Sequence, residues 1–161
     1  MIRKDYPSIL FVCLGNICRS PLVEAVARRR CEEAGLSVRL ASCGTGNWHV
    51  GKGADPRMRR AAEAAGYDLA PHRARQVRAD DFITHDWVLA MDGENLEALL
   101  SLRGQRGTEP ALFLPWAGVA SPQEFPDPYF GDEEGFRQAV TLAERGVDGL
   151  IARLRANHVS P

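Results

Sequence analysis

The stretch Ser8–Pro21 reads SILFVCLGNICRSP and decides the fold. Its first five residues form a short apolar run, which is typical of a buried strand. Ser20 followed by Pro21 is typical of a helix start, because a serine can cap the first turn and proline lacks the N–H that would have no partner there. Between strand and helix lies a glycine-containing loop that holds Cys13 and Arg19. This order predicts an anion-binding loop at the carboxyl end of a strand.

The loop from Cys13 to Arg19 combines the groups that bind a tetrahedral oxyanion. Successive backbone N–H groups can form an inward-pointing nest, and the following helix adds the positive end of its dipole. The guanidinium of Arg19 can meet phosphate oxygens bidentately. The same field favours the thiolate of Cys13, which is the nucleophilic form of cysteine. Asn16 suits the left-handed backbone conformation that a tight loop requires.

Length and composition are those of a globular domain. The chain has 161 residues, 45% of them hydrophobic and 25% charged, with a formal net charge of -1. That charge argues against general nucleic-acid binding, because no excess of Lys and Arg neutralises a phosphate backbone. No apolar run is long enough to span a bilayer, and the start MIRKDYPS is too short and polar for a signal peptide. We expect one domain over residues 1–161, in the cytoplasm and without a membrane partner.

Strand and helix patterns alternate along the chain. Further strands are expected at Val38–Cys43, Trp87–Met91 and Ala111–Leu114. Helices are expected from Ser20 to a stop at Gly35, from Asp55 to Ala65, over Leu96–Leu102 behind an Asp92 cap, and over Glu133–Ala156. The alternation predicts an α/β fold with one open parallel sheet of about four strands and helices on both faces. Ligands of such sheets bind outside the carboxyl ends of the strands, where Cys13 lies.

The four cysteines do not indicate a disulfide or zinc framework. Without a secretion signal, reduced thiols are the default. The spacing from Cys13 to Cys18 differs from a short zinc knuckle, and Cys31 and Cys43 supply no second knuckle. We therefore expect neither a metal nor a cofactor.

The late segment Phe125–Gly131, FPDPYFG, supplies a candidate proton donor. Cleavage of a phosphate ester needs a nucleophile, charge stabilisation and a proton for the leaving oxygen. Asp127 lies between two prolines that stiffen the loop, beside the aromatic residues Tyr129 and Phe130. Alone, an Asp-Pro pair indicates an ordinary turn. Together with Cys13 it predicts a general acid.

The string VCLGNICRSP resembles the signature of the low-molecular-weight protein tyrosine phosphatases. The strings SCGTGNWHVG, HRARQV, FITHDWVLAMD and PDPYFG follow in the family's order along nearly the whole chain. The resemblance implies hydrolysis of phosphotyrosine through a cysteinyl-phosphate, with Cys13 as nucleophile, Arg19 as phosphate ligand and Asp127 as general acid and then base. Its substrates would be phosphotyrosine proteins or peptides, and its product inorganic phosphate. A monomer and a weak homodimer both remain open.

The resemblance also implies supporting roles around the loop. Ser20 would donate its hydroxyl to the thiolate, and Asn16 would anchor a hydrogen-bond network with Ser20, Ser42 and His72. An ordinary surface or core position suits His72 equally well. Cys18 resembles the family's second loop cysteine, which traps an oxidised nucleophile as a reversible disulfide. Loop packing is the alternative for Cys18.

The side chains around the substrate come from three places. The phosphate-binding loop would consist of Leu14, Gly15, Asn16, Ile17, Cys18 and Ser20. A slot for an aromatic ring would be lined by Trp48, Tyr129 and Phe130, which favours phosphotyrosine over the shorter phosphoserine.

We expect a solvated face, rather than a site for acidic peptides, at Arg57, Arg59 and Arg60.

Three other functions compete with this interpretation. Thioredoxin-coupled arsenate reductases share the fold and loop but need two further cysteines in the middle of the chain, and none lies between Gly44 and Pro161. Protein arginine phosphatases carry threonine where this chain has Ile17. A non-catalytic phosphate-binding module would be expected to lose Cys13 or Asp127, and both are present.

Overall fold

A four-stranded parallel sheet organises the chain, for which the computed structural model describes residues 6–129 and 131–159. The strands are β1 (Ser8–Cys13), β2 (Arg39–Gly44), β3 (Trp87–Ala90) and β4 (Ala111–Leu112), arranged in the order β2-β1-β3-β4. All three pairings are parallel. Every residue of β1 is buried, as a strand covered on both faces requires.

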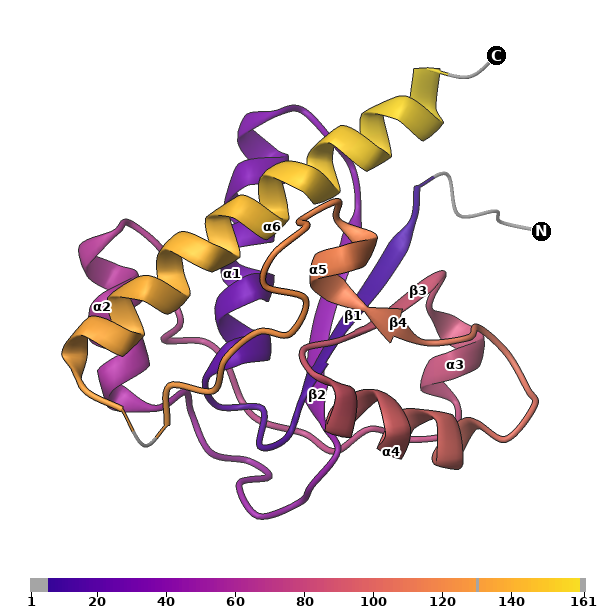
Figure 1. Cartoon of the computed structure of the whole chain (residues 1–161), viewed down its shortest axis with the longest axis horizontal. Helices are drawn as coiled ribbons and strands as arrows, with labels where there is room; N and C mark the ends of the chain where they lie inside the picture. The colour runs from indigo at the N-terminus through magenta and orange to yellow at the C-terminus, as the bar shows by residue number, and fades with distance from the viewer. Residues whose placement is uncertain (1–5, 130, 160–161) are drawn as a thin grey trace.

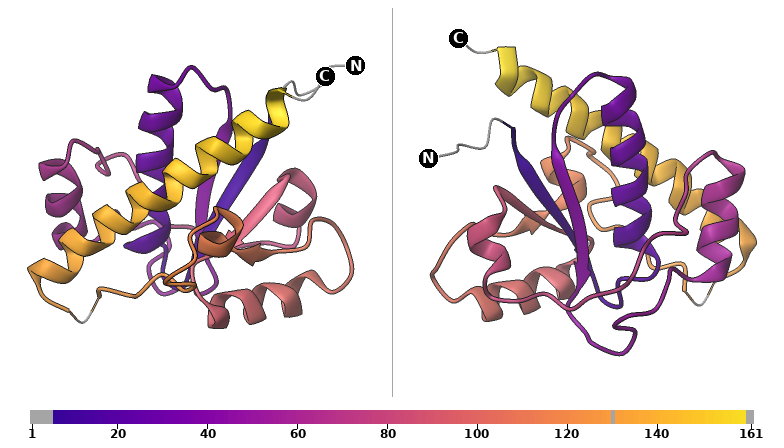
Figure 2. Two further views of the ribbon diagram at one scale, coloured as in Figure 1. Left: turned by 45° about the horizontal axis from the view of Figure 1, so that its top comes forward. Right: turned by 180° about the vertical axis from the view of Figure 1, so that it is seen from behind.

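Helices cover both faces of the sheet, as predicted (Figure 1). One face packs against α1 (Arg19–Glu33), α5 (Phe113–Trp116) and α6 (Glu133–Val159), and α2 (Pro56–Ala64) packs on α6. The other face carries α3 (Asp81–Thr84) and α4 (Gly93–Arg103). Figure 2 shows the same layers from two further sides.

The alternation of side chains along β1 decides which helices each residue meets. Ile9, Phe11 and Cys13 belong to the apolar cluster shared with α1 and α6, whereas Leu10 and Val12 belong to the cluster shared with α4. Successive residues of a strand point to opposite faces. Cys13, the last residue of β1, therefore points toward the face on which α1 begins.

Two aspartates cap helices as predicted. Asp55 accepts the N–H groups of Arg57 and Met58 at the start of α2. Asp92 accepts the N–H of Asn95 at the start of α4. None of the helices in the described part of the chain combines the length and apolarity needed to cross a membrane.

The structure corrects the predicted cap at Ser20. Helix α1 begins at Arg19, so Ser20 lies inside the first turn, and no side chain caps this end. The hydroxyl of Ser20 lies 2.9 Å from the sulfur of Cys13 instead. The local capping preference has been overridden by a contact with the preceding strand.

The predicted strand Ala111–Leu114 is also wrong in its second half. The strand ends at Leu112, and the next four residues form the single helical turn α5. A short apolar run does not distinguish strand from helix, so packing decides. Here the ring of Phe113 turns edge-on against that of Phe11, with 5.5 Å between the centroids. The short helix α3 was not predicted.

Candidate active site

The loop between β1 and α1 surrounds the sulfur of Cys13 with hydrogen-bond donors. The N–H of Asn16 donates to the sulfur at 3.3 Å, and the hydroxyl oxygen of Ser20 lies 2.9 Å from it. Cys13 and Arg19 are each only 3% exposed. Cys13 and Arg19, the expected nucleophile and phosphate ligand, therefore sit at the bottom of the site.

Asn16 is the centre of the hydrogen-bond network. It is fully buried and adopts the predicted left-handed conformation, with φ 59°. Its amide nitrogen donates to Ser20 (2.8 Å) and Ser42 (3.0 Å), and its amide oxygen accepts the N–H of Arg75 at 3.0 Å. Its carbonyl oxygen lies 2.6 Å from Nε2 of His72. A carbonyl only accepts, so His72 carries a proton on Nε2. The structure thus brings together the four residues assigned to this network.

The direction of these hydrogen bonds can be worked out from Glu24. Its carboxylate only accepts, so Ser42 donates to Glu24 Oε1 at 2.7 Å. Ser42 and Ser20 each accept a proton of the Asn16 amide. The hydroxyl proton of Ser20 then has two acceptors within reach, the sulfur of Cys13 at 2.9 Å and the carbonyl oxygen of Cys43 at 3.4 Å. The Ser20 hydroxyl thus links the Asn16 network to the sulfur of Cys13.

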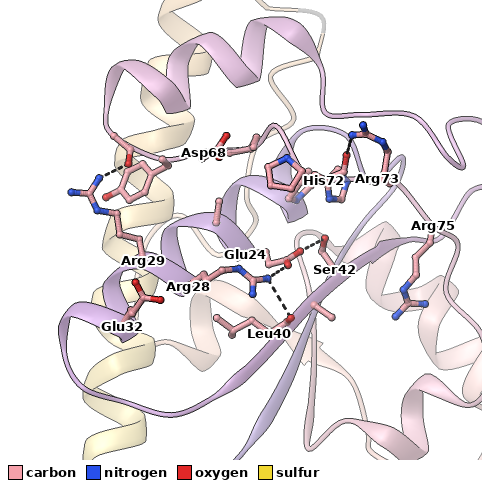
Figure 3. A pocket seen from close by; sticks show the side chains of 17 residues that line it. Glu24, Arg28, Arg29, Glu32, Leu40, Ser42, Asp68, His72, Arg73 and Arg75 are labelled. Carbon is pink, nitrogen blue, oxygen red and sulfur yellow. Dashed lines mark hydrogen bonds and ion pairs between the residues drawn. The ribbon is translucent and has the colours of Figure 1, made fainter.

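Sequence analysis did not identify Glu24. A usable signal was its position one helical turn after Ser20, which places both side chains on one side of α1. Figure 3 shows Glu24 in a cavity of about 670 Å³ between α1, β2 and residues 66–75, pointing toward Ser42 and Arg28. Arg28 forms an ion pair with it. Cys13 does not line this larger cavity, so the chemistry lies elsewhere.

Two other segments orient the guanidinium of Arg19. Its Nη1 donates to Asp92 Oδ2 at 2.7 Å and to the carbonyl of Phe125 at 2.9 Å. Its Nη2 lies 3.7 Å from Asp127 Oδ2. Burial would lower the pKa of Arg19, but Cys13, Asp92 and Asp127 more than compensate, so that pKa is raised and the positive charge is kept. Sequence analysis assigned Asp92 only its capping role.

A cavity of about 170 Å³ collects the expected reactive groups. It is lined by Cys13, Leu14, Gly15, Ile17, Cys18, Arg19, Trp48, His49, Asp127 and Tyr129. Trp48 is 65% exposed, which rules out the core position and leaves it at the rim. His49 was not anticipated, although it directly follows Trp48. Phe130, the third expected rim residue, lies outside the described residues.

The remaining cysteines are held as thiols. All four cysteines are free and buried. Burial, with help from Asp55, raises the pKa of the Cys18 thiol far above its ordinary value. Burial also raises the pKa of Cys31 to about 11 and that of Cys43 further still. Within residues 6–129 and 131–159, no group of three or more His, Cys, Asp or Glu side chains is placed to hold a metal ion.

Comparison with known proteins decides the family. The family model described as low molecular weight phosphotyrosine protein phosphatase matches residues 8–160. The chain belongs to the low-molecular-weight protein tyrosine phosphatase family. A relative from Streptomyces coelicolor named low molecular weight protein-tyrosine-phosphatase is 40% identical over 159 residues, which cover 91% of this chain and 93% of the relative.

Solved structures are similar in fold to this low-molecular-weight phosphatase over almost its full length. A protein tyrosine phosphatase from Entamoeba histolytica gives a TM-score of 0.88 at 33% identity and covers 95% of this chain and 99% of its own. A Drosophila arginine phosphatase gives a TM-score of 0.82 at 28% identity and covers 90% of this chain and 96% of its own. The family and fold inferred from the motif are confirmed.

Proposed function

We propose that this phosphatase hydrolyses phosphotyrosine monoesters through a phosphoryl group carried on Cys13. The observation that carries the proposal is that Cys13, Arg19 and Asp127 line one cavity of about 170 Å³. A nucleophile, a fixed positive fork and a proton donor are the groups that phosphate-ester cleavage requires. We take residues 1–161 as the unit that performs the reaction.

In the first step the thiolate of Cys13 attacks phosphorus in line with the bond to the tyrosine oxygen. The S–P bond forms as the P–O bond breaks, and Asp127 gives its proton to the departing phenolate. Arg19 and the N–H groups of the loop hold the equatorial phosphate oxygens. The contacts of Arg19 Nη1 with Asp92 and the Phe125 carbonyl fix the plane of the fork before substrate arrives.

In the second step water releases the phosphate. Asp127, now ionised, takes a proton from a water molecule whose oxygen attacks phosphorus, and the S–P bond breaks. The Asp127 side chain is 42% exposed, which gives water a path to it. The returning thiolate is stabilised by the Ser20 hydroxyl and the Asn16 N–H. Inorganic phosphate is the product, and the enzyme regains its starting protonation state.

Phosphotyrosine on a protein or peptide suits the depth of the site. The sulfur of Cys13 is nearly buried, whereas Trp48 and Tyr129 line the cavity around it. A long, flat phosphotyrosine side chain can carry its phosphate to the sulfur while its ring stacks on aromatic neighbours. Phosphoserine is too short to do so without bringing the peptide backbone into the cavity.

Three peptides that differ only in the phosphorylated residue test the proposal. We expect kcat/KM to be highest on phosphotyrosine, lower on phosphoarginine and lowest on phosphoserine, with EDTA present throughout. Cys13→Ser is expected to abolish turnover, and Asp127→Asn to slow it about 10²-fold or more, as for loss of a general acid.

Each part of the proposal has its own contradicting result. Turnover retained in Cys13→Ser would remove the cysteinyl-phosphate. Preference for phosphoarginine would contradict the phosphotyrosine specificity and would agree with the arginine phosphatase named for the Drosophila relative. Inactivation by EDTA would contradict a mechanism in which Arg19 and the loop N–H groups alone stabilise the phosphoryl charge.

A further inference from the structure

The guanidinium of Arg57 joins three segments around the active site. Its Nε and Nη2 form a fork with the two carboxylate oxygens of Asp55, at 3.1 and 2.9 Å. The guanidinium also lies over two aromatic rings, 5.2 Å from the centroid of Tyr129 and 4.8 Å from that of Phe136. The expectation of a purely solvated face is therefore wrong for Arg57. Arg60, on the same helix, is exposed.

Asp55 ties this fork to the phosphate-binding loop. Its N–H donates to the carbonyl of Ile17 at 2.9 Å. Burial alone would raise the pKa of the Asp55 carboxyl, but hydrogen bonds from the side chain and backbone of Arg57 more than offset this and lower it. The carboxylate is thus ionised, 7% exposed and fixed. The position of Arg57 is set relative to the loop that holds the phosphate.

Tyr129 ties the other side of Arg57 to the general acid. The Tyr129 N–H donates to Asp127 Oδ1 at 3.0 Å, while Oδ2 of the same carboxyl lies 3.7 Å from Arg19 Nη2. Oδ1 thereby accepts a hydrogen bond from the loop's own backbone, whereas Oδ2 faces the site. A tilt of the backbone at Tyr129 would turn the carboxyl of Asp127 with it.

Phe136 supplies the fixed surface on the far side. It is the fourth residue of α6 and is 1% exposed within the main apolar cluster. The planar guanidinium of Arg57 contacts this buried ring and the ring of Tyr129 together, as arginine stacking on aromatic faces allows. The loop that carries Asp127 is therefore held from the core through Arg57.

We propose that Arg57 is a positioning residue for the general acid. By holding Tyr129 next to Phe136 and the Asp55 cap, it fixes the N–H that orients the carboxyl of Asp127 toward the leaving oxygen. This inference rests on the proposed phosphatase reaction. It assigns Arg57 an effect on proton donation, and none on the attack by the thiolate.

Leaving-group dependence separates these two effects. Phenyl phosphate releases a basic phenolate that needs a proton, whereas p-nitrophenyl phosphate releases a much weaker base. We expect Arg57→Met to lower kcat/KM about tenfold on phenyl phosphate and at most about twofold on p-nitrophenyl phosphate. The matched control Arg60→Met, on the same helix, should leave both values unchanged. Arg57→Lys keeps the charge but not the planar fork. We therefore expect it to lower kcat/KM on phenyl phosphate less than Arg57→Met does, and again more on phenyl phosphate than on p-nitrophenyl phosphate.

A double-mutant cycle tests whether Arg57 acts through the acid. In an Asp127→Asn background, which has no proton to donate, Arg57→Met should cost less than about twofold further on phenyl phosphate. Equal losses on both substrates, an unabated loss in the Asp127→Asn background, or no difference from Arg60→Met would overturn the proposal. If Arg57→Met does not fold, the selectivity of Arg57→Lys decides.

Failure of the proposed function gives a different result. In that case the unaltered protein does not hydrolyse phosphotyrosine peptides or either aryl phosphate, and the role of Arg57 falls with it. If the unaltered protein is active and the Arg57 variants lose activity without leaving-group selectivity, only the positioning role is refuted.

Discussion

Replacement of Asn16 by alanine removes the centre of the network beneath Cys13. The Arg75 N–H loses its acceptor, at a cost of about 1–3 kcal/mol. The hydroxyls of Ser20 and Ser42 each lose a donor but keep another partner, at about 1 kcal/mol apiece. Alanine at the left-handed φ of 59° adds strain of about 1–2 kcal/mol. We expect Asn16→Ala to lower the free energy of unfolding by about 5 kcal/mol, which is a large part of the roughly 5–15 kcal/mol of a typical domain.

Asn16→Gly separates the lost hydrogen bonds from the backbone strain. Glycine loses the same side-chain bonds but adopts positive φ without penalty. Its greater freedom in the unfolded chain offsets part of that gain, so we expect Asn16→Gly to be more stable than Asn16→Ala by about 0.5–1 kcal/mol.

Urea unfolding followed by tryptophan fluorescence and far-ultraviolet circular dichroism measures both differences, provided that the two probes coincide. A loss below about 1 kcal/mol for Asn16→Ala would show that the network contributes little to stability. An alanine variant as stable as the glycine variant would refute the assignment of strain to this position.

Three further predictions follow from single contacts. Asp92→Asn keeps the cap of α4 but loses the ion pair with the buried arginine, so we expect kcat/KM to fall about tenfold and the free energy of unfolding to fall by about 3 kcal/mol in the same urea measurement. Cys18→Ser should keep kcat/KM within about twofold yet fail to regain activity with dithiothreitol after peroxide, whereas the unaltered protein recovers; equal recovery would exclude the protective disulfide. Gly149→Ala places a Cβ 1.8 Å from the carbonyl oxygen of Ala117 and should destabilise by about 3 kcal/mol. Gly135→Ala in the same helix, with nothing nearer than 3.8 Å, should be neutral or stabilising in the same urea measurement.

The elements predicted correctly are those that local chemistry determines. The apolar run that became β1, the Asp55–Pro56 start of α2 and the Gly35 stop of α1 each depend on a few neighbouring residues. The motif Cys13–Arg19 belongs to the same class, because the spacing of its residues already shapes the loop. Such local patterns predict the same strand, helix start or loop in almost any tertiary context.

The errors arose where a distant contact competes with a local preference. Ser20 has the residue type of a cap, but the sulfur at the end of β1 offers its hydroxyl a better partner. Phe113 has the apolar neighbours of a strand, but its contact with Phe11 favours a helical turn. Glu24 looks like a solvent-facing helix residue until β2 brings Ser42 to it. In each case the deciding partner is far along the chain or on another element.

The two capping aspartates show how a correct local assignment can hide a role in the site. Asp92 uses Oδ1 for the N–H of Asn95 and Oδ2 for Arg19. Asp55 likewise caps α2 with Oδ1 and holds Arg57 with both oxygens. Serine would cap either helix but has no second oxygen for an arginine. Where a helix starts beside the active site, an aspartate cap therefore indicates an arginine nearby that the site uses, and Asp→Ser at either position should spare the helix while releasing that arginine.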